Sequence, residues 1–192
     1  MSGFDLQGFM RNIINHPELS EQVTMRQYRK REYIFSQGEV CRDVFFMQRG
    51  LVKLYYNTVD GKEWIKSFIA DKGIIGSRAS QTLGKESPFS ALCLEDTELF
   101  RLPYAEFEKM CFDDLSLARS VFYFNQWLGV KKEVREYQLL CLSAEEAYAG
   151  FVNENPGLVE RITQIDIARY LGVTPIALSR IKRRVIDKGG EF

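Results

Sequence analysis

The sequence predicts an α+β protein with antiparallel strands in the N-terminal half, one long helix after them, and a pair of short helices at the C-terminus. Three observations support this fold class. Glycines recur among short β-rich runs; residues 113–142 carry helical periodicity; and residues 163–184 show two short helix patterns on either side of Gly172.

The region from Tyr33 to Pro103 alternates turns with the runs VFFM, LVKLYYNTV, WIKSFI, FSALCL and ELFRL. Glycines at 38, 50, 61, 73 and 84 are separated by 12, 11, 12 and 11 residues. Turns at such regular intervals are typical of an antiparallel sandwich or barrel. The pair Asp60-Gly61 predicts a type I′ hairpin turn, in which both central residues take positive φ.

The segment DDLSLARSVFYFNQWLGVKKEVREYQLLCL predicts one long helix with two apolar stripes. The first stripe, expected to cover the β domain, is Leu117, Val121, Phe124 and Leu128. The second has heptad-like steps of 4, 3, 4, 3 and 4 and is Tyr123, Trp127, Val130, Val134, Tyr137 and Cys141, of which the first five are the candidate contacts. We expect it to form the seam of a homodimer; the alternative is that both stripes are intramolecular core.

The C-terminal quarter carries a series of helix start and stop signals. SAEE at 143–146 is a capping box that begins a helix, which runs to about Asn155. Thr163 then caps a short helix, Gly172 ends it, and Thr174-Pro175 begins another. This spacing is that of a helix-turn-helix, for which a small core is available in Ile165, Ile167 or Ala168, Leu171, Val173, Leu178 and Ile181.

Charge is balanced over the chain but not along it. The totals are 26 basic and 26 acidic residues, yet residues 161–192 hold seven basic against three acidic ones, a net of +4. A neutral protein that binds nucleic acid needs such a local positive surface for the phosphates. A solvated basic helix is the alternative, and the helix-turn-helix spacing favours DNA binding over it.

Several classes of function are disfavoured. The chain has no G-x-x-x-x-G-K-[ST], G-x-G-x-x-G or G-x-S-x-G motif, and His16 is its only histidine, so we expect no enzyme. Four cysteines at 41, 93, 111 and 141 form no C-x-x-C pair, which predicts reduced, mostly buried thiols and no metal site. No cofactor is indicated.

The N-terminus resembles no signal peptide, and no apolar run is long enough to span a membrane. We therefore expect a cytoplasmic protein that does not engage the membrane.

Two stretches carry a resemblance to a known family: GKEWIKSFIADKGIIGS after the glycine-punctuated strands, and ITQIDIARYLGVTPIALSRIKRR at the C-terminus. Together with the order of elements, they resemble the Crp/Fnr family of bacterial transcription regulators, and LGVTPIALSRI resembles its Bacteroidetes-type branch. The resemblance implies a cyclic-nucleotide-binding-like β-roll of jelly-roll type as sensor over 1–110, a dimerisation helix over 111–142, and a DNA-binding helix-turn-helix domain over 143–192.

The resemblance also implies partners: double-stranded DNA with a two-fold-symmetric operator, a second copy of the chain and a small-molecule effector. RNA polymerase is a further candidate. In the DNA-binding part, Arg180 matches a guanine-contacting arginine, a role that suits its bidentate donors. The positions that match contacts to phosphates or neighbouring bases are Thr163, Gln164, Thr174 and Ser179, and we expect Lys182, Arg183 and Arg184 to hold phosphates.

Two features depart from the best-studied members. Pro175 and Ile176 stand where those have Arg and Glu, so we expect a different operator. The sequence ends eight residues after Arg184, so we expect the usual two-stranded wing to be shortened or absent.

The sensor part lacks the charged anchors of the family's cyclic-nucleotide cassette. Gly76-Ser77 replaces Gly-Glu, and Ser87-Pro88 replaces Arg-Ser, so we expect no cyclic AMP binding. Candidate residues for a pocket that binds another effector are Gly76, Ser77, Arg78, Ser80, Gln81, Ser87 and Lys132. The alternative is that their polarity is that of an exposed loop.

The sequence thus predicts a homodimeric, sequence-specific DNA-binding transcription regulator whose β-roll senses an effector other than cyclic AMP. The rival hypothesis is a small-molecule-sensing or protein-interaction module that no longer recognises DNA specifically.

Overall fold

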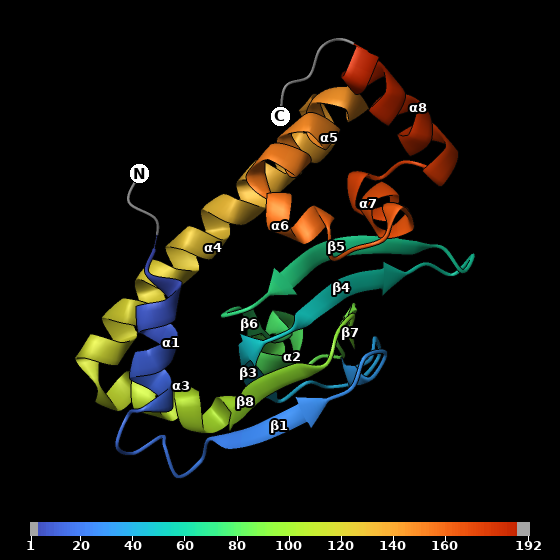
Figure 1. Ribbon diagram of the computed structural model, residues 1–192. Coiled ribbons are helices and arrows are strands. Elements are labelled where there is room, and N and C mark those ends of the chain that lie inside the picture. Colours follow the sequence, from blue (N-terminus) through green and yellow to red (C-terminus); the bar gives the residue numbers. More distant parts are fainter. Residues whose placement is uncertain (1–3, 188–192) are drawn as a thin grey trace. The chain divides into compact units, whose positions relative to one another are not determined.

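The computed structural model of the protein describes residues 4–187 (Figure 1). The chain divides into two compact units, one made of Met1–Asn57 and Lys66–Leu128, the other of Thr58–Ile65 and Gly129–Phe192. Within the described range, no helix is long and apolar enough to cross a membrane. The expectation that the wing is shortened or absent concerns residues 188–192, which lie outside the described residues, as does Lys188 of the basic count.

The strands of the first half form two four-stranded sheets. One sheet has the order β1-β8-β3-β6 and the other β2-β7-β4-β5. The strands are β1 (Thr24–Tyr28), β2 (Tyr33–Phe35), β3 (Asp43–Arg49), β4 (Leu51–Asn57), β5 (Glu63–Ala70), β6 (Ile74–Ile75), β7 (Ser90–Cys93) and β8 (Thr97–Pro103). The pairings β1–β8, β3–β8, β3–β6, β2–β7 and β4–β7 are antiparallel, so the predicted antiparallel β domain is confirmed.

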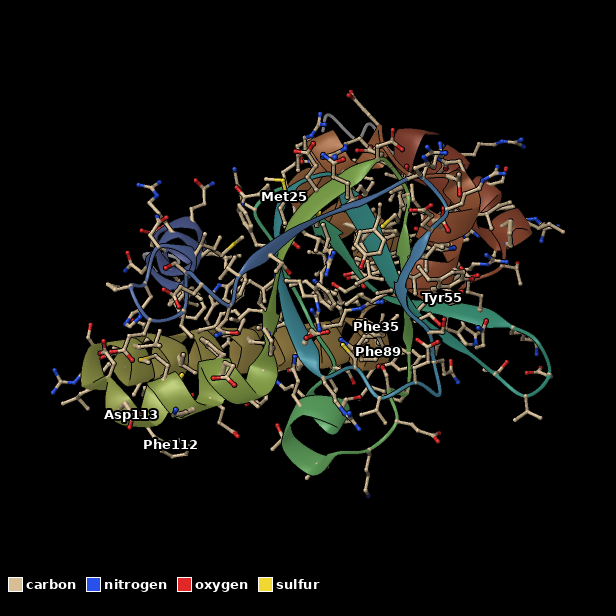
Figure 2. All side chains as sticks on the ribbon, turned by 90° about the horizontal axis from the view of Figure 1, so that it is seen from below. Met25, Phe35, Tyr55, Phe89, Phe112 and Asp113 are labelled. Carbon is tan, nitrogen blue, oxygen red and sulfur yellow. The ribbon has the colours of Figure 1, made fainter. Side chains whose placement is uncertain are left out.

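Aromatic and aliphatic side chains from these strands form a buried core cluster. The rings of Phe35 and Phe89 meet edge to face, 5.6 Å apart between centroids, and lie together among the strands in Figure 2. Met47, Val52 and Leu99 are fully enclosed in the same cluster. Apolar positions on the inner faces of the strands therefore drive the closure of this half of the chain.

A second core cluster lies under the helices α1 (Leu6–Ile14), α3 (Tyr104–Asp113) and α4 (Leu115–Cys141). Leu117 is buried there, and Val121 and Phe124 pack against it, which confirms that the first stripe of the long helix covers the β domain. The single long helix predicted over 113–142 is confirmed as α4, which begins two residues later because Asp114 ends α3 and accepts hydrogen bonds from the first N–H groups of α4. Phe112, at the end of α3, points away from the protein (Figure 2).

Two local predictions for the β half are wrong. The loop between β4 and β5 contains Gly61 at φ 77°, but Asp60 is not at positive φ, so the turn is not type I′. Instead, the Gly61 N–H donates to the Thr58 carbonyl, and the Lys62 carbonyl accepts from Thr58 N–H, which gives a longer hairpin loop. Between β6 and β7 lies the short helix α2 (Arg78–Leu83), which the strand periodicity gave no sign of.

The C-terminal part consists of α5 (Ala144–Glu154), α6 (Pro156–Val159), α7 (Gln164–Leu171) and α8 (Pro175–Asp187). The capping box at Ser143 and Glu146 is present, and the hydrogen bonds from Ser143 lower the pKa of the Glu146 carboxyl. The buried apolar side chains described in α7 and α8 are Ile167, Ala168, Leu171, Leu178, Ile181 and Val185. The predicted small core is confirmed except at Ile165, which is 49% exposed, and at Val173, which is only half-buried.

Candidate nucleic-acid interface

The helix-turn-helix is held by three local devices that the sequence predicted. Thr163 caps α7: its hydroxyl accepts from the Asp166 N–H at 3.1 Å and donates to the Asp166 carboxylate at 2.6 Å. Gly172 ends α7 at φ 74°, a left-handed conformation that glycine adopts without strain. Thr174 then caps α8 by accepting from the Ala177 N–H at 3.1 Å, with Pro175 as the first helical residue.

These caps fix which side of α8 faces outward. The buried residues Leu178, Ile181 and Val185 mark the inner side. At about 100° per residue, four exposed side chains share an arc of roughly 100° on the outer side. They are Ile176, Ser179, Arg180 and Arg183, and we call this set the outer face of α8.

The basic residues of α8 differ in what they contact. Lys182 Nζ donates to Gln164 Oε1 at 2.9 Å, and Arg184 pairs with Glu145 at 2.8 Å. Among the described residues, neither Arg180 nor Arg183 has a hydrogen-bond or ion-pair partner. The two guanidinium groups on the outer face are thus open, whereas the two cations on its flanks are held by neighbouring helices.

A hollow of about 510 Å³ lies beside one flank of α8 and is lined in part by Arg180, Arg184 and Glu145. Arg180 therefore stands at the border between the outer face and this hollow. Because an exposed ion pair such as Arg184–Glu145 contributes little, Arg184 can leave it for a stronger anion at small cost.

Arg135 connects the second half of α4 to the helix-turn-helix. Its guanidinium lies 3.8 Å from the centre of the Tyr170 ring and donates to the Tyr170 carbonyl near the end of α7. Burial lowers the pKa of Arg135, but the group remains a cation because its usual pKa is far above neutrality. No local sequence pattern indicates this contact, since 35 residues separate the partners.

The predicted dimer seam is exposed in the single chain for four of its five residues. Tyr123, Val130, Val134 and Tyr137 all have exposed side chains on α4. Trp127 departs from the prediction: it is half-buried, with its ring 5.9 Å from both Phe4 and Phe124. The tryptophan ring therefore packs in an aromatic cluster with Phe4 and Phe124.

The polarity of an exposed loop does not explain the three serines among the candidate effector residues. Ser77, Ser80 and Ser87 are all buried. The Ser87 hydroxyl donates to the Phe89 carbonyl at 2.8 Å. In the described part of the chain, the hydroxyls of Ser77 and Ser80 have no hydrogen-bond partner, although buried polar groups usually do.

The rest of this segment is closed by its own side chains. The Gln81 amide donates to the Asp43 carbonyl at 2.8 Å. It also fills the space beside Gly76, where an added Cβ would lie 2.4 Å from Gln81 Nε2. Arg78 donates to the Asn125 side chain on α4. Lys132, also on α4, is exposed.

The four cysteines are free thiols. Burial raises the pKa of Cys41, and raises that of Cys93 and Cys111 to about 11, so all three remain protonated at neutral pH. Cys41 and Cys93 are buried and Cys111 is half-buried, so the expectation of mostly buried thiols fails only at Cys141, which is exposed. Residues 4–187 contain no cluster of three His, Cys, Asp or Glu side chains suited to a metal ion.

Comparison with known proteins agrees with this architecture. Residues 25–114 match the model of the cyclic nucleotide-binding domain. The chain is 25% identical over 180 residues to the transcriptional activator protein anr of Pseudomonas aeruginosa, covering 85% of this chain and 71% of that protein. It is 26% identical over 191 residues to the fumarate and nitrate reduction regulatory protein of Vibrio cholerae, covering 89% and 74%. In sequence and in architecture the chain is similar to regulators of the Crp/Fnr type.

A protein of known structure has the same fold as this chain. FixK2 from Bradyrhizobium japonicum superposes with a TM-score of 0.76 at 24% identity, over 87% of this chain and 86% of that one. The fold predicted from the sequence is thereby confirmed. The relatives quoted are named as regulators, which agrees with the expectation that the protein is not an enzyme.

Proposed function

We propose that this Crp/Fnr protein is a homodimeric transcription regulator that recognises a two-fold-symmetric DNA operator with the outer face of α8. One observation carries the proposal: Arg180 and Arg183 stand open on the outer side of a helix whose start is fixed by the Thr174 cap and whose inner side is locked by buried side chains. A recognition helix needs this combination, because base contacts require side chains on a rigid support.

The surroundings of each side chain support different roles within the proposal. Arg180 is the base-reading residue, with Ser179 beside it, because an open guanidinium can bond guanine O6 and N7 together. Arg183 and Arg184 hold phosphates, and Lys182 does so with Gln164, its hydrogen-bond partner. The hydroxyls of Thr163 and Thr174 serve their helix caps, which leaves N–H groups at the helix starts to meet phosphates.

The dimer is proposed on the exposed apolar row of Tyr123, Val130, Val134 and Tyr137. Exposing such a row to water is unfavourable by about 25 cal/mol per Å² of apolar surface, and burying it between two copies removes this cost. A dimer paired along α4 has two-fold symmetry, and the operator that it recognises is expected to share this symmetry. A regulator that binds DNA in a bacterium acts in the cytoplasm, and RNA polymerase is its candidate partner there.

The β-roll is proposed as the sensor of an effector other than cyclic AMP. The segment that would hold a cyclic phosphate carries neither the glutamate nor the arginine of the family cassette, and Arg78 is engaged with Asn125. Residues 1–110, 111–142 and 143–192 remain our proposed division into sensor, dimerisation helix and DNA-binding domain.

Selection of bound sequences from random duplexes by the full-length protein tests the proposal. We expect enrichment of one inverted repeat, with half-sites about 34 Å apart, and binding that weakens steeply with salt. Binding without sequence preference, or no binding, would favour the rival hypothesis of a sensing or interaction module. The control is the same selection carried out with Arg180→Ala, whose selected sequences are compared with those of the native protein.

A further inference from the structure

The first turn of α8 presents a chemistry that the basic residues further along the helix do not. Its side chains are Pro175, Ile176 and Ala177, and no acidic residue lies among them. None of the three can donate or accept a hydrogen bond through its side chain. The part of a recognition helix that enters the major groove first therefore offers only apolar contact here.

Ile176 is the apolar group on the outer face of α8. Its side chain is 70% exposed, although isoleucine is among the residues most often buried. The Thr174 cap and Pro175 place it at the second helical position, and Arg180 follows on the same side one turn later. Its β-branched side chain keeps essentially one χ1 rotamer in a helix, so little entropy is lost when it is packed.

The major groove contains one apolar group by which a base pair can be distinguished, the 5-methyl of thymine. A glutamate at this position would instead accept a hydrogen bond from cytosine N4. Resting on the proposed DNA-binding function, we propose that Ile176 is a specificity-determining residue that packs against a thymine methyl in each half-site.

The helix geometry also says where this thymine lies. Ile176 and Arg180 are four residues apart, which is about 6 Å along the helix axis. Successive bases of one strand rise about 3.4 Å. The thymine that contacts Ile176 therefore lies one or two base pairs from the guanine assigned to Arg180, toward the side that the N-terminus of α8 enters.

Modified DNA tests this without altering the protein. The probe is the operator obtained by selection, with deoxyuridine in place of each thymidine in turn, and affinity is measured by fluorescence anisotropy. Uracil keeps every hydrogen-bonding group of thymine and lacks only the methyl. We expect one uracil position per half-site to weaken binding about three- to tenfold, as the loss of one buried methyl contact implies, and 5-methylcytosine at that position to bind better than cytosine.

Protein variants then locate the contact. Ile176→Ala should bind the thymine operator as weakly as the native protein binds the uracil operator, and should no longer distinguish the two. Ile165→Ala is the matched control, because Ile165 is also an exposed isoleucine on the first turn of a helix, α7. It should retain the native ratio between thymine and uracil. Ile176→Glu should move the selected base at that position toward cytosine.

The outcomes separate this inference from the function on which it rests. If no operator can be selected, the proposed DNA-binding function fails. If an operator is selected but every uracil substitution is silent, or if Ile176→Ala keeps the native ratio, the function stands and the assignment of Ile176 is overturned.

Discussion

The segment from Gly76 to Ser87 and the helix α8 are both rich in polar residues, yet the chain uses them in opposite ways. In the first segment, Ser77, Ser80 and Ser87 are buried and Gln81 bonds the backbone of β3. On α8, Ser179, Arg180 and Arg183 are exposed. The first segment buries its serines and the second keeps its polar side chains exposed, so composition alone does not show which polar side chains can meet a ligand from solvent.

The difference follows from what each segment packs against. α8 has a continuous apolar side, Leu178, Ile181 and Val185, which fixes its polar side outward. The helix α2 is only one and a half turns long and buries Ser80 rather than an apolar side chain. It is held by single polar contacts such as Arg78 with Asn125. Arg78 has to leave Asn125 before it can meet a ligand, whereas among the described residues Arg180 and Arg183 make no such contact.

The largest expected effect tests whether α8 acts as one of a pair. Val130→Glu on the exposed row of α4 should convert a dimer to a monomer in sedimentation, because the seam would bury an unpaired carboxylate. Operator binding should fall more than for any single change on α8. Lys132→Glu, on the opposite side of the helix, is the control and should remain dimeric. A native monomer at micromolar concentration would contradict the seam.

The next effect distinguishes the outer face of α8 from its flanks. Arg180→Ala should cost about 1 to 3 kcal/mol on the selected operator and relax preference at one position per half-site. Arg184→Ala should weaken all sequences alike and reduce the salt slope by about one, since Arg184 is proposed to hold a phosphate. Binding titrations on operator and random DNA at several salt concentrations measure both. Equal losses on the two DNAs for Arg180→Ala would make Arg180 a phosphate contact.

A smaller effect probes the closed segment. Ser77→Ala removes a buried hydroxyl that has no partner in the described structure, so the free energy of unfolding should stay the same or rise by up to about 1 kcal/mol. Ser87→Ala removes the hydrogen bond to the Phe89 carbonyl and should lower the free energy of unfolding by about 1 kcal/mol. Urea unfolding measures the free energy of unfolding of both variants. A loss at Ser77 equal to that at Ser87 would show that the Ser77 hydroxyl has a partner in solution.

The smallest expected signal is that of cyclic nucleotides. Calorimetric titration with cyclic AMP or cyclic GMP should give no saturable heat below about 1 mM, because a cyclic phosphate without a paired arginine is desolvated with no compensating bond. Micromolar binding would contradict this and would identify Arg78 as the anchor, released from Asn125. Arg78→Gln would then abolish the heat, and the closed segment would prove to be a working pocket.

Much of the fold was predictable because its signals are local. The Ser143 capping box, the Thr163 and Thr174 caps and the Gly172 helix end each depend on a few neighbouring residues, and all of them form as predicted. The outer face of α8 follows in the same way, since a helix start and an apolar side together fix the direction of every other side chain. The Asp60-Gly61 turn failed although its signal is local, because a longer hydrogen-bonded loop competes with the two-residue turn.

The sequence by itself thus determined the strand-rich half, the long helix and the helix-turn-helix, because periodicity and capping act within a few residues along the chain. Only the tertiary structure decided that Ser77 and Ser80 are buried, that Trp127 joins Phe4 and Phe124, and that Arg184 is paired while Arg183 is open. These outcomes depend on partners brought close by folding. The physical reason is that burial, and the satisfaction of a polar group, are properties of the whole packed chain and not of its local pattern.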